Sequence, residues 1–263
     1  MRADCAGQPT GAFGVDIGGS GIKGAPVDLI VGELSTPRVR IPTPDPATPK
    51  AVAKVVARLV DSFDLPKYLP IGVTFPAPIV HGVAKLAANV DESWIGTDVS
   101  ELIGKHTGRA VFAVNDADAA GYAEVLYGAA RGVRGTVLLV TLGTGIGSGL
   151  IVDGVLVPNT EFGHLEIDGK DAEERASDAA RVRHDMSWSD WAKHLQRYFR
   201  VLEDLVWPDL IVIGGGVSKK HDNYLPLLRL RTPIVPAALF NNAGIVGAAA
   251  LAARAGEGAR SRD

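Results

Sequence analysis

Two glycine-rich segments of the chain hold the residue types that bind phosphate. Backbone N–H groups in a glycine turn can approach phosphate oxygens without interference from Cβ, and glycine also permits a positive φ. Ser20, Thr141, Thr144 and Ser148 add hydroxyl donors. One such turn could be no more than a tight hairpin, but two in matching halves of the chain indicate phosphate binding. The candidate ligands are Asp16, Gly18, Gly19, Ser20, Gly21 and Lys23 in the first segment and Thr141, Gly143, Thr144 and Gly145 in the second.

The first segment also contains the G-x-G-x-x-G pattern of a dinucleotide-binding loop, at residues 19–24. That kind of site needs a helix directly after the glycines and an acidic residue about 20 positions later. Here Pro26 follows closely, and residues 27–32 have the pattern of a strand and a turn. The second segment leads in the same way into an apolar run and the turn pair at 153–154. We therefore predict two strand–turn–strand phosphate hairpins and no dinucleotide site.

A third glycine run follows the apolar residues 210–213. Ligands of open α/β folds bind at the ends of strands, where such a run would lie. Two phosphate hairpins together with this third glycine edge indicate phosphoryl transfer. The candidate donor-binding residues here are Gly214, Gly215, Gly216, Lys219 and Lys220.

The remaining pattern predicts α/β architecture. Apolar residues recur at helical spacing from Thr48, a candidate N-cap, to Phe63, and from Ser187 to Pro208, where Ser187 and Asp190 have capping-box spacing. Between the helices lie short apolar runs with the pattern of strands. A weak internal repeat relates residues 14–29 to 138–156, which indicates two lobes of related topology. The predicted strands are residues 13–17, 71–75, 111–114, 137–141, 149–152 and 210–213, with an extended connection over 37–49.

Composition excludes several function classes. The 263 residues, 46% of them hydrophobic, carry a net charge of −3, which does not favour nucleic-acid binding. The longest apolar runs fall short of the roughly 20 residues of a membrane span, and the first residues do not resemble a secretory signal. The single cysteine, Cys5, cannot form an intrachain disulfide, which fits a reducing cytoplasm.

Taken in order, these motifs resemble those of the ROK family of sugar kinases, in the actin-like ATPase superfamily. The resemblance runs from Gly14 to about Ala253 and includes Asn115 with Asp116, similar to the family's catalytic segment, and Glu161 with His164, similar to its E-x-G-H sugar motif. It implies a two-lobed, ribonuclease H-like fold with a cleft between the lobes. We expect lobes at residues 1–118 and 119–263, with a helix over 242–254 returning to the first lobe. Members of the family are often homodimers.

The resemblance also implies roles in phosphoryl transfer to a sugar hydroxyl. Asp116 would be the general base, and Asp16 would hold Mg²⁺ directly or through water. From the residues alone, Asp116 could instead cap the helix that follows, with Asp118 as another candidate cap, and Asp16 could stabilise its turn. Isolated Glu and His side chains are commonly structural. The candidate sugar contacts are Asn89, Asn115, Asp116, Glu161, His164 and Glu173.

Two expectations about the sugar site depend on how the residues after His164 align with the family's motifs. Glu173 is preferred to Glu174 because it stands four residues before Ser177, as the family's acidic sugar ligand stands before a serine. Many ROK proteins carry a cysteine-rich zinc motif after E-x-G-H, but residues 168–177 contain no cysteine. We therefore predict no zinc and a sugar-contacting His164.

A narrower resemblance concerns the phosphoryl donor. The segments AANVDESWIGTDV, PNTEFGHLEIDGK and WPDLIVIGGGVSKK are similar to the polyphosphate glucokinases of actinobacteria. This implies transfer from inorganic polyphosphate, with ATP as a further donor, to the 6-hydroxyl of glucose. A strictly ATP-dependent glucokinase, a kinase for mannose or another hexose, and a non-catalytic ROK regulator are the alternatives; a regulator would carry a helix-turn-helix domain before the first strand.

Polyphosphate would require a row of cations beyond the reacting phosphate. Basic side chains follow the third glycine run or lie on the tryptophan-rich helix that begins after Ser187. They could form that row, or they could belong to a solvated charged face, because acidic residues are interspersed. They are Lys193, Arg197, Arg200, Lys219, Lys220, Arg229 and Arg231.

Overall fold

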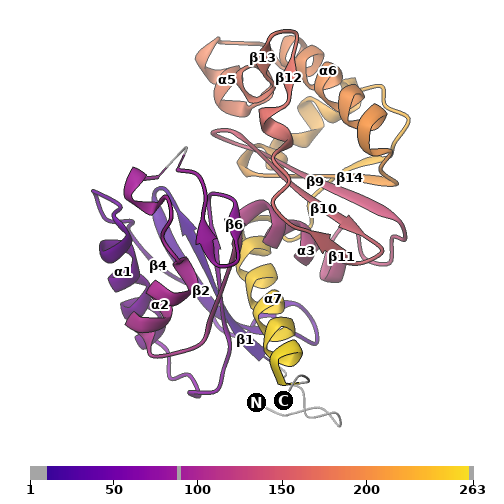
Figure 1. The fold of residues 1–263 in the computed structure, drawn as a ribbon. Helices are drawn as coiled ribbons and strands as arrows, with labels where there is room; N and C mark the ends of the chain where they lie inside the picture. Colours follow the sequence, from indigo (N-terminus) through magenta and orange to yellow (C-terminus); the bar gives the residue numbers. More distant parts are fainter. Residues whose placement is uncertain (1–10, 88–89, 261–263) are drawn as a thin grey trace. The chain divides into compact units, whose positions relative to one another are not determined.

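The computed structural model describes residues 11–87 and 90–260, of which 257–260 are described by their backbone only. The chain divides into two compact units (Figure 1). Unit 1 comprises Met1–Ala123 and Asn242–Asp263, and unit 2 comprises Glu124–Asn241. The chain leaves unit 1 inside helix α3 (Asp116–Tyr127) and returns to it just before helix α7 (Ala243–Arg260).

Unit 1 is built on a six-stranded sheet in the order β3-β2-β1-β5-β8, with β4 paired to β2. β1 is antiparallel to β2 and parallel to β5, and β5 is parallel to β8. A short hairpin, β6 (Ile79–Val80) and β7 (Val83–Ala84), precedes the 3-10 helix η1 (Glu92–Trp94). The sheet strands are β1 (Gly11–Gly18), β2 (Gly21–Asp28), β3 (Glu33–Leu34), β4 (Val39–Ile41), β5 (Ile71–Phe75) and β8 (Val111–Asn115).

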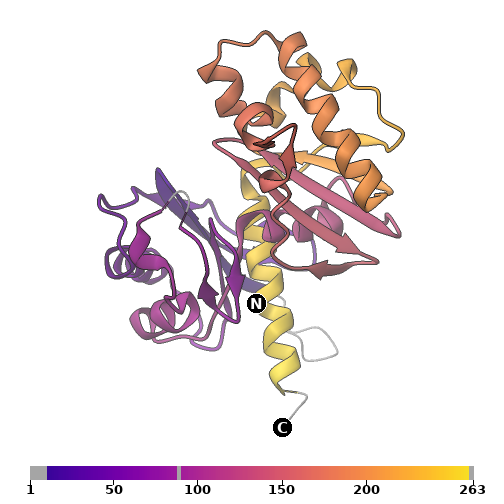
Figure 2. The same cartoon turned by 45° about the horizontal axis from the view of Figure 1, so that its top comes forward.

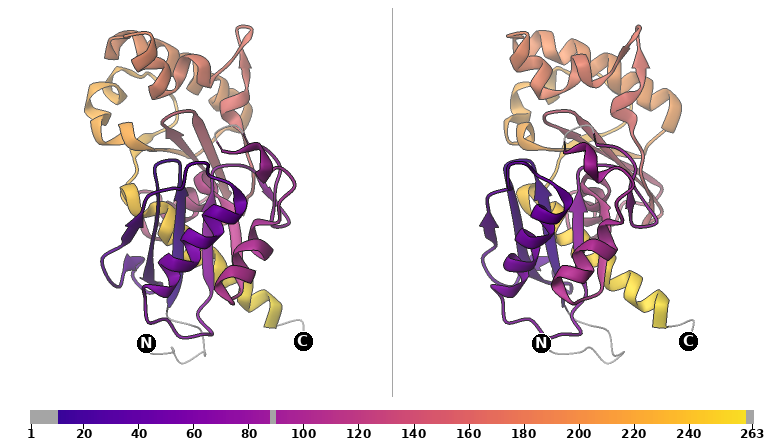
Figure 3. Two further views of the ribbon diagram at one scale, coloured as in Figure 1. Left: turned by 90° about the vertical axis from the view of Figure 1, so that its left-hand side faces the viewer. Right: turned by 60° about the vertical axis from the view of Figure 1, so that its left-hand side comes forward.

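Helices cover both faces of this sheet (Figures 2 and 3). On one face, α1 (Pro49–Asp61) and α2 (Val99–Thr107) pack onto alternate residues of the strands and form a buried apolar core. On the other face lies α7, whose backbone comes so close that a Cβ at Gly14 or Gly72 would overlap a carbonyl of the helix. The two glycines therefore allow α7 to pack directly on β1 and β5.

Unit 2 has a five-stranded sheet in the order β11-β10-β9-β14-β15. It starts like the sheet of unit 1, because an antiparallel hairpin, β9–β10, is followed by a parallel strand, β14, beside β9. Helix α6 (Trp188–Val206) covers one face of the sheet with an apolar stripe (Figure 1). The strands are β9 (Thr136–Leu142), β10 (Ile146–Val152), β11 (Val155–Val157), β14 (Leu210–Gly214) and β15 (Ile234–Pro236).

Shorter elements of unit 2 connect these strands. The 3-10 helices are η2 (Phe162–His164), η3 (Gly216–Asn223), η4 (Leu225–Leu227) and, at the return to unit 1, η5 (Phe240–Asn242). The strands β12 (Glu166–Ile167) and β13 (Lys170–Asp171) form a separate hairpin before helices α4 (Glu173–Ala176) and α5 (Asp178–Arg183).

The α/β fold expected from the sequence is confirmed, with two local differences. Ser187 caps α6 as predicted, since its Oγ accepts the backbone N–H of Asp190 at 3.1 Å, whereas the Thr48 side chain makes no capping bond to α1. The connection over 37–49 contains strand β4, which pairs with β2. Within the described residues, none of the helices is long and apolar enough to cross a membrane.

Candidate active site

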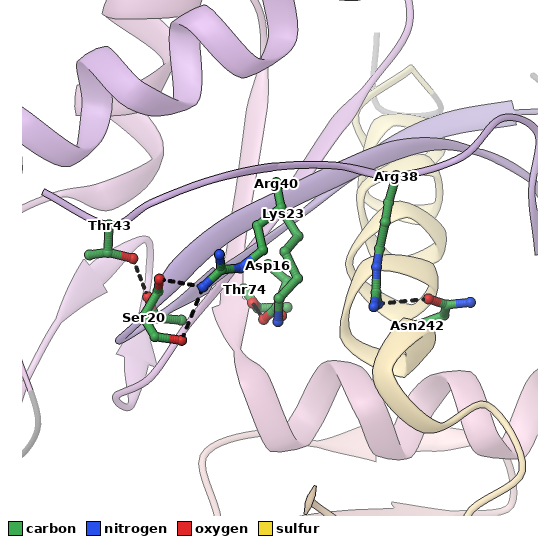
Figure 4. Close-up of polar contacts among 9 residues, drawn as sticks. Asp16, Ser20, Lys23, Arg38, Arg40, Thr43, Thr74 and Asn242 are labelled. Carbon is green, nitrogen blue, oxygen red and sulfur yellow. Dashed lines mark hydrogen bonds and ion pairs between the residues drawn. The ribbon is translucent and has the colours of Figure 1, made fainter.

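A row of polar side chains crosses four strands of unit 1 (Figure 4). Asp16 on β1 is paired in register with Lys23 on β2 and with Thr74 on β5, and Lys23 is paired with Arg40 on β4. Side chains alternate between the faces of a strand, so this row is on the face opposite the core against α1. Gly244 of α7 lies near its centre, where an added Cβ would be 3.5 Å from Oδ1 of Asp16.

The carboxylate of Asp16 is held by its neighbours on both sides. The Nζ of Lys23 lies 3.3 Å from Oδ2, and the Oγ1 of Thr74 donates to Oδ1 at 2.9 Å (Figure 4). Asp16 is thus engaged across the sheet, which does not support the alternative that it stabilises the turn. Sequence reasoning missed Thr74, although a threonine within an apolar strand run was a usable signal.

The turn between β1 and β2 is held by side chains from the segment around β4. The Oγ1 of Thr43 donates to the carbonyl of Gly18 at 2.5 Å, and Nη2 of Arg40 donates to the carbonyl of Ser20 at 2.6 Å. A Cβ at Gly19 would meet no atom within 4 Å, so a ligand has room to approach the turn. Gly21 lies under the guanidinium of Arg40.

The hairpin glycines do not use the positive φ that glycine permits. Neither the first hairpin nor Gly143 and Gly145 of the second shows one, while Gly215 does, with φ 81°. At two of these glycines a side chain lies close instead: a Cβ at Gly21 would meet the guanidinium of Arg40, and one at Gly145 would meet the carboxylate of Glu173.

Asn115 and Asp116 stand where β8 ends and α3 begins. The Oδ1 of Asn115 accepts the backbone N–H groups of Ala117 at 2.8 Å and Asp118 at 3.1 Å, so Asn115 is the cap of α3. Asp118, the other candidate cap, is buried. Asp116 is exposed, and its Oδ1 also accepts the N–H of Ala117 at 2.8 Å. A buried amide therefore fixes the backbone that presents an exposed carboxylate.

The second hairpin and the third glycine run lie side by side in unit 2. Thr141 on β9 is paired with Gly214 on β14, and a Cβ at Gly215 would overlap the backbone of Leu142. Thr144 in the hairpin turn is exposed, as are Lys219 and Lys220 beyond Gly216. These predicted donor-binding residues are brought to one edge of the sheet.

Glu173 is attached to the second hairpin. Its Oε2 accepts the backbone N–H of Ile146 at 3.1 Å, directly after the turn. The same turn is closed by a bond from the N–H of Gly143 to the carbonyl of Gly145. Glu173, which we expected to contact the sugar, therefore supports the turn that we expected to bind phosphate. Its position in the sequence did not indicate this contact.

The E-x-G-H motif is held by a buried hydroxyl. Ser148, only 1% exposed, donates to the carbonyl of Thr160 at 2.6 Å and accepts the N–H of Phe162 at 3.0 Å. The expectation that Ser148 binds phosphate is therefore wrong. The Nδ1 of His164 lies 3.1 Å from Oδ2 of Asp171, and a carboxylate oxygen at that position accepts a hydrogen bond from the ring, which orients the imidazole.

Glu161 has a perturbed acidity. Partial burial raises the pKa of its carboxyl group, His164 opposes this rise, and the negative charge of Glu173 adds to it. His164 and Glu173 therefore lie near enough to Glu161 to influence the pKa of its carboxyl group. Asn115 and Asp116 belong to unit 1, and Asn89 lies outside the described residues.

Several of the basic residues considered for polyphosphate are paired with carboxylates. Lys193 lies 2.7 Å from Asp190, and Arg231 contacts Asp204 at 3.0 Å and the ring of Trp207. Arg197 donates to Asp168 and thereby lowers the pKa of that carboxyl group. These pairs favour the charged-face alternative for the exposed side of α6.

The donor set around Asp16 fits a hydrated cation bound together with phosphate. Over residues 11–87 and 90–260, no group of three or more His, Cys, Asp or Glu side chains could hold a metal ion alone. Mg²⁺ is commonly bound through one or two carboxylates, with substrate phosphates and water as the other ligands. A single carboxylate beside a phosphate hairpin meets that requirement.

Comparison with known proteins identifies close relatives. A sequence model of the ROK family matches residues 12–180. The chain is 53% identical over 238 residues to the polyphosphate glucokinase of Mycobacterium tuberculosis (strain CDC 1551 / Oshkosh), covering 90% of this chain and 89% of that protein. It is similar to the inorganic polyphosphate/ATP-glucomannokinase structure from Arthrobacter sp. strain KM, with a TM-score of 0.90, 56% identity, and coverage of 94% and 100% of the two chains.

A more distant structure has the same fold. The ROK family glucokinase of Streptomyces griseus, solved with glucose and AMPPNP, matches with a TM-score of 0.80 at 23% identity, and the match covers 93% of this chain and 99% of that one.

Proposed function

The chain belongs to the ROK family, and we propose that it is a kinase that transfers a phosphoryl group from inorganic polyphosphate to the 6-hydroxyl of glucose. ATP is a second donor in this proposal. The observation that carries the reaction type is the exposed carboxylate of Asp116, fixed at the start of α3 by the Asn115 cap. The donor is supported by two relatives, a polyphosphate glucokinase and an inorganic polyphosphate/ATP-glucomannokinase, that are 53% and 56% identical to this chain.

Asp116 is the proposed general base. A sugar hydroxyl is a poor nucleophile, so a carboxylate that accepts its proton accelerates attack on the phosphoryl group. Asn115 fixes the backbone at Asp116 and thereby limits where the carboxylate can lie. The proposed sugar ligands are Asn89, Asn115, Asp116, Glu161, His164 and Glu173.

The two hairpins and the third glycine run are the proposed donor-binding elements. Backbone N–H groups at the turns would bind phosphate oxygens, and Lys23 would neutralise charge close to Asp16. Kinases of this kind need a divalent metal, which neutralises charge on the transferred phosphate when bound. We propose Mg²⁺, held by Asp16 directly or through water.

Mannose is a second candidate acceptor, because the Arthrobacter relative is named a glucomannokinase. A homodimer is proposed from the resemblance to the family, and a cytoplasmic location from the single cysteine. Neither the homodimer nor the location affects the chemistry proposed for the site.

A donor comparison tests the proposed function. Purified protein is incubated with glucose and Mg²⁺, with long-chain polyphosphate or ATP as the only donor, and glucose 6-phosphate is measured with a dehydrogenase. Product from polyphosphate in the absence of ATP is expected. Product from ATP alone would show a strictly ATP-dependent glucokinase, and product from neither donor would reject the activity.

A further inference from the structure

Three cations project from one face of unit 1, beside the first phosphate hairpin. Figure 4 shows Lys23, Arg38 and Arg40 on the same side of β2 and the β4 segment. The alternation of side chains explains this, because the neighbouring residues in the sequence, Ile22, Val39 and Ile41, pack into the core against α1. The positive charge is thus concentrated on the face that also carries Asp16.

Arg40 is held across the hairpin turn through one end of its guanidinium. Nη2 donates to the carbonyl of Ser20 at 2.6 Å and lies 3.5 Å from Oγ of the same residue. A Cβ at Gly21 would come within 2.8 Å of Cζ, so glycine is required for this placement. An arginine has five N–H donors, and in the described part of the chain no residue accepts from Nε or Nη1.

The charge environment of Arg40 differs from that of the cations on α6. Lys193 and Arg197 are each within 3.0 Å of a carboxylate oxygen, whereas Arg40 forms no ion pair with a described carboxylate. Its side chain is exposed. A guanidinium that is fixed, exposed and not neutralised by an acidic partner is suited to bind a phosphate through two parallel hydrogen bonds.

Arg38, in the segment directly before β4, extends this cationic surface. Its Nη1 donates to Oδ1 of Asn242 at 3.0 Å, which orients the side chain on the same face as Arg40 (Figure 4). Residues two apart in an extended segment are separated by about 7 Å, so the two guanidinium groups can contact successive parts of one chain of anions. ATP continues into a nucleoside beyond its three phosphates and offers no such repeat.

We propose, on the basis of the function proposed above, that Arg40 and Arg38 bind phosphates of the polyphosphate donor beyond the reacting one. They are then specificity-determining residues for long-chain polyphosphate over ATP. This surface belongs entirely to unit 1, whereas the basic residues considered from the sequence belong to unit 2.

The test measures donor kinetics for Arg40→Ala, Arg38→Ala and the double variant, with long-chain polyphosphate, tripolyphosphate and ATP at saturating glucose. Loss of one charge-assisted contact to phosphate is expected to raise the KM for long-chain polyphosphate about tenfold per arginine. The rise in KM for ATP should be smaller than about twofold by the same argument. Increasing salt should raise the long-chain KM less steeply in the double variant, because fewer phosphate contacts remain.

Two further variants separate binding from structural damage. Lys54→Ala removes a charge from an exposed position on α1, on the opposite face of the sheet, and should leave every KM unchanged. Arg40→Lys keeps the charge but loses the planar fork, so an intermediate KM for polyphosphate is expected. Equal losses with ATP and polyphosphate, or an unchanged KM for polyphosphate, would overturn the inference. If the unaltered protein makes no product from polyphosphate, the proposed function fails, and the inference fails with it.

Discussion

The Nζ of Lys23 lies 3.3 Å from Oδ2 of Asp16, and the two residues are direct cross-strand partners in the first hairpin. Both side chains are mostly buried, which strengthens their interaction with each other and with any anion bound at the turn. One lysine thus balances the charge of the proposed magnesium ligand and adds a cation to the proposed phosphate site.

Lys23→Met should weaken donor binding without affecting glucose. Removing one cation from the phosphate site is expected to raise the KM for polyphosphate and for ATP about tenfold each, because a charge-assisted contact is lost. The KM for glucose should stay the same. Initial rates with varied donor and varied glucose measure the three constants, and unchanged donor constants would show that Lys23 serves only the fold.

Asn115→Ala should destabilise the start of α3. It removes the acceptor of two backbone N–H groups, and loss of a helix cap costs about 1–2 kcal/mol in the free energy of unfolding. Because the backbone at Asp116 is then less well fixed, kcat should fall as well. Denaturant unfolding and steady-state kinetics measure both effects.

Asn115→Asp is the matched control, since it keeps the oxygen that caps the helix. It should restore the free energy of unfolding that Asn115→Ala loses. If both variants unfold as readily as each other, the cap is not the stabilising feature of Asn115.

Glu124 at the start of unit 2 holds the loop after α3 and one segment distant in the sequence. Its buried carboxylate accepts backbone N–H groups from Ala129 at 2.7 Å, Ala238 at 3.1 Å and Leu239 at 2.8 Å. Glu124→Leu leaves these donors without their acceptor and should lower the free energy of unfolding by about 3–5 kcal/mol. Glu124→Gln, which keeps one acceptor oxygen, should lose less in the same denaturant titration. Equal losses for both variants would contradict this account.

The raised pKa of Glu161 predicts a pH dependence of glucose binding. Burial favours the protonated form, so the carboxyl group titrates above its ordinary value of 4.5. If the ionised form accepts hydrogen bonds from glucose, affinity should fall as the pH is lowered through this raised pKa, at a higher pH than an unperturbed glutamate would give. Calorimetric titration of glucose at several pH values measures it, and an identical profile for Glu161→Gln would assign the effect to another group.

The raised pKa of Glu161 affects the stability of the fold in the opposite direction to glucose binding. A carboxyl group whose folded pKa is raised binds its proton more tightly in the native state than in the unfolded state. Its contribution to stability is therefore present at low pH and is lost as the pH rises through the folded pKa. Lowering the pH should therefore weaken glucose binding, whereas the contribution of Glu161 to the free energy of unfolding should increase. The opposite directions distinguish the effect on binding from the effect on stability.

Local pattern predicted the elements that carry the site, but not the contacts between them. Apolar periodicity located α1, α6 and the main strands, and the residues after the glycines showed that β2 follows the first turn. Strand β4 was missed because three residues between prolines have no strong strand pattern, and its pairing with β2 is a tertiary contact. The position of Arg40 over Gly21 follows from that pairing, so it could not be predicted either.

Two buried polar residues have roles in the structure that differ from those expected from the sequence. Ser148 was expected to bind phosphate because it follows a glycine turn, but strand alternation points it into the unit, where it holds the residues before Phe162. Asn115 was expected only as a sugar ligand, although an Asn before an Asp at a helix start is also a capping signal. In both cases the hydrogen-bonding need of nearby backbone decided the role of the side chain.

The rate of phosphoryl transfer by Asp116→Asn tests the central claim most directly. With polyphosphate and glucose saturating, loss of the general base should lower kcat about 10²–10⁴-fold, because asparagine cannot accept the proton of the 6-hydroxyl. Glucose affinity by calorimetry should change far less than kcat, since the amide keeps the shape of the side chain and one oxygen that accepts a hydrogen bond from the sugar. A kcat within about tenfold of the unaltered protein would contradict the assignment of Asp116 as the base.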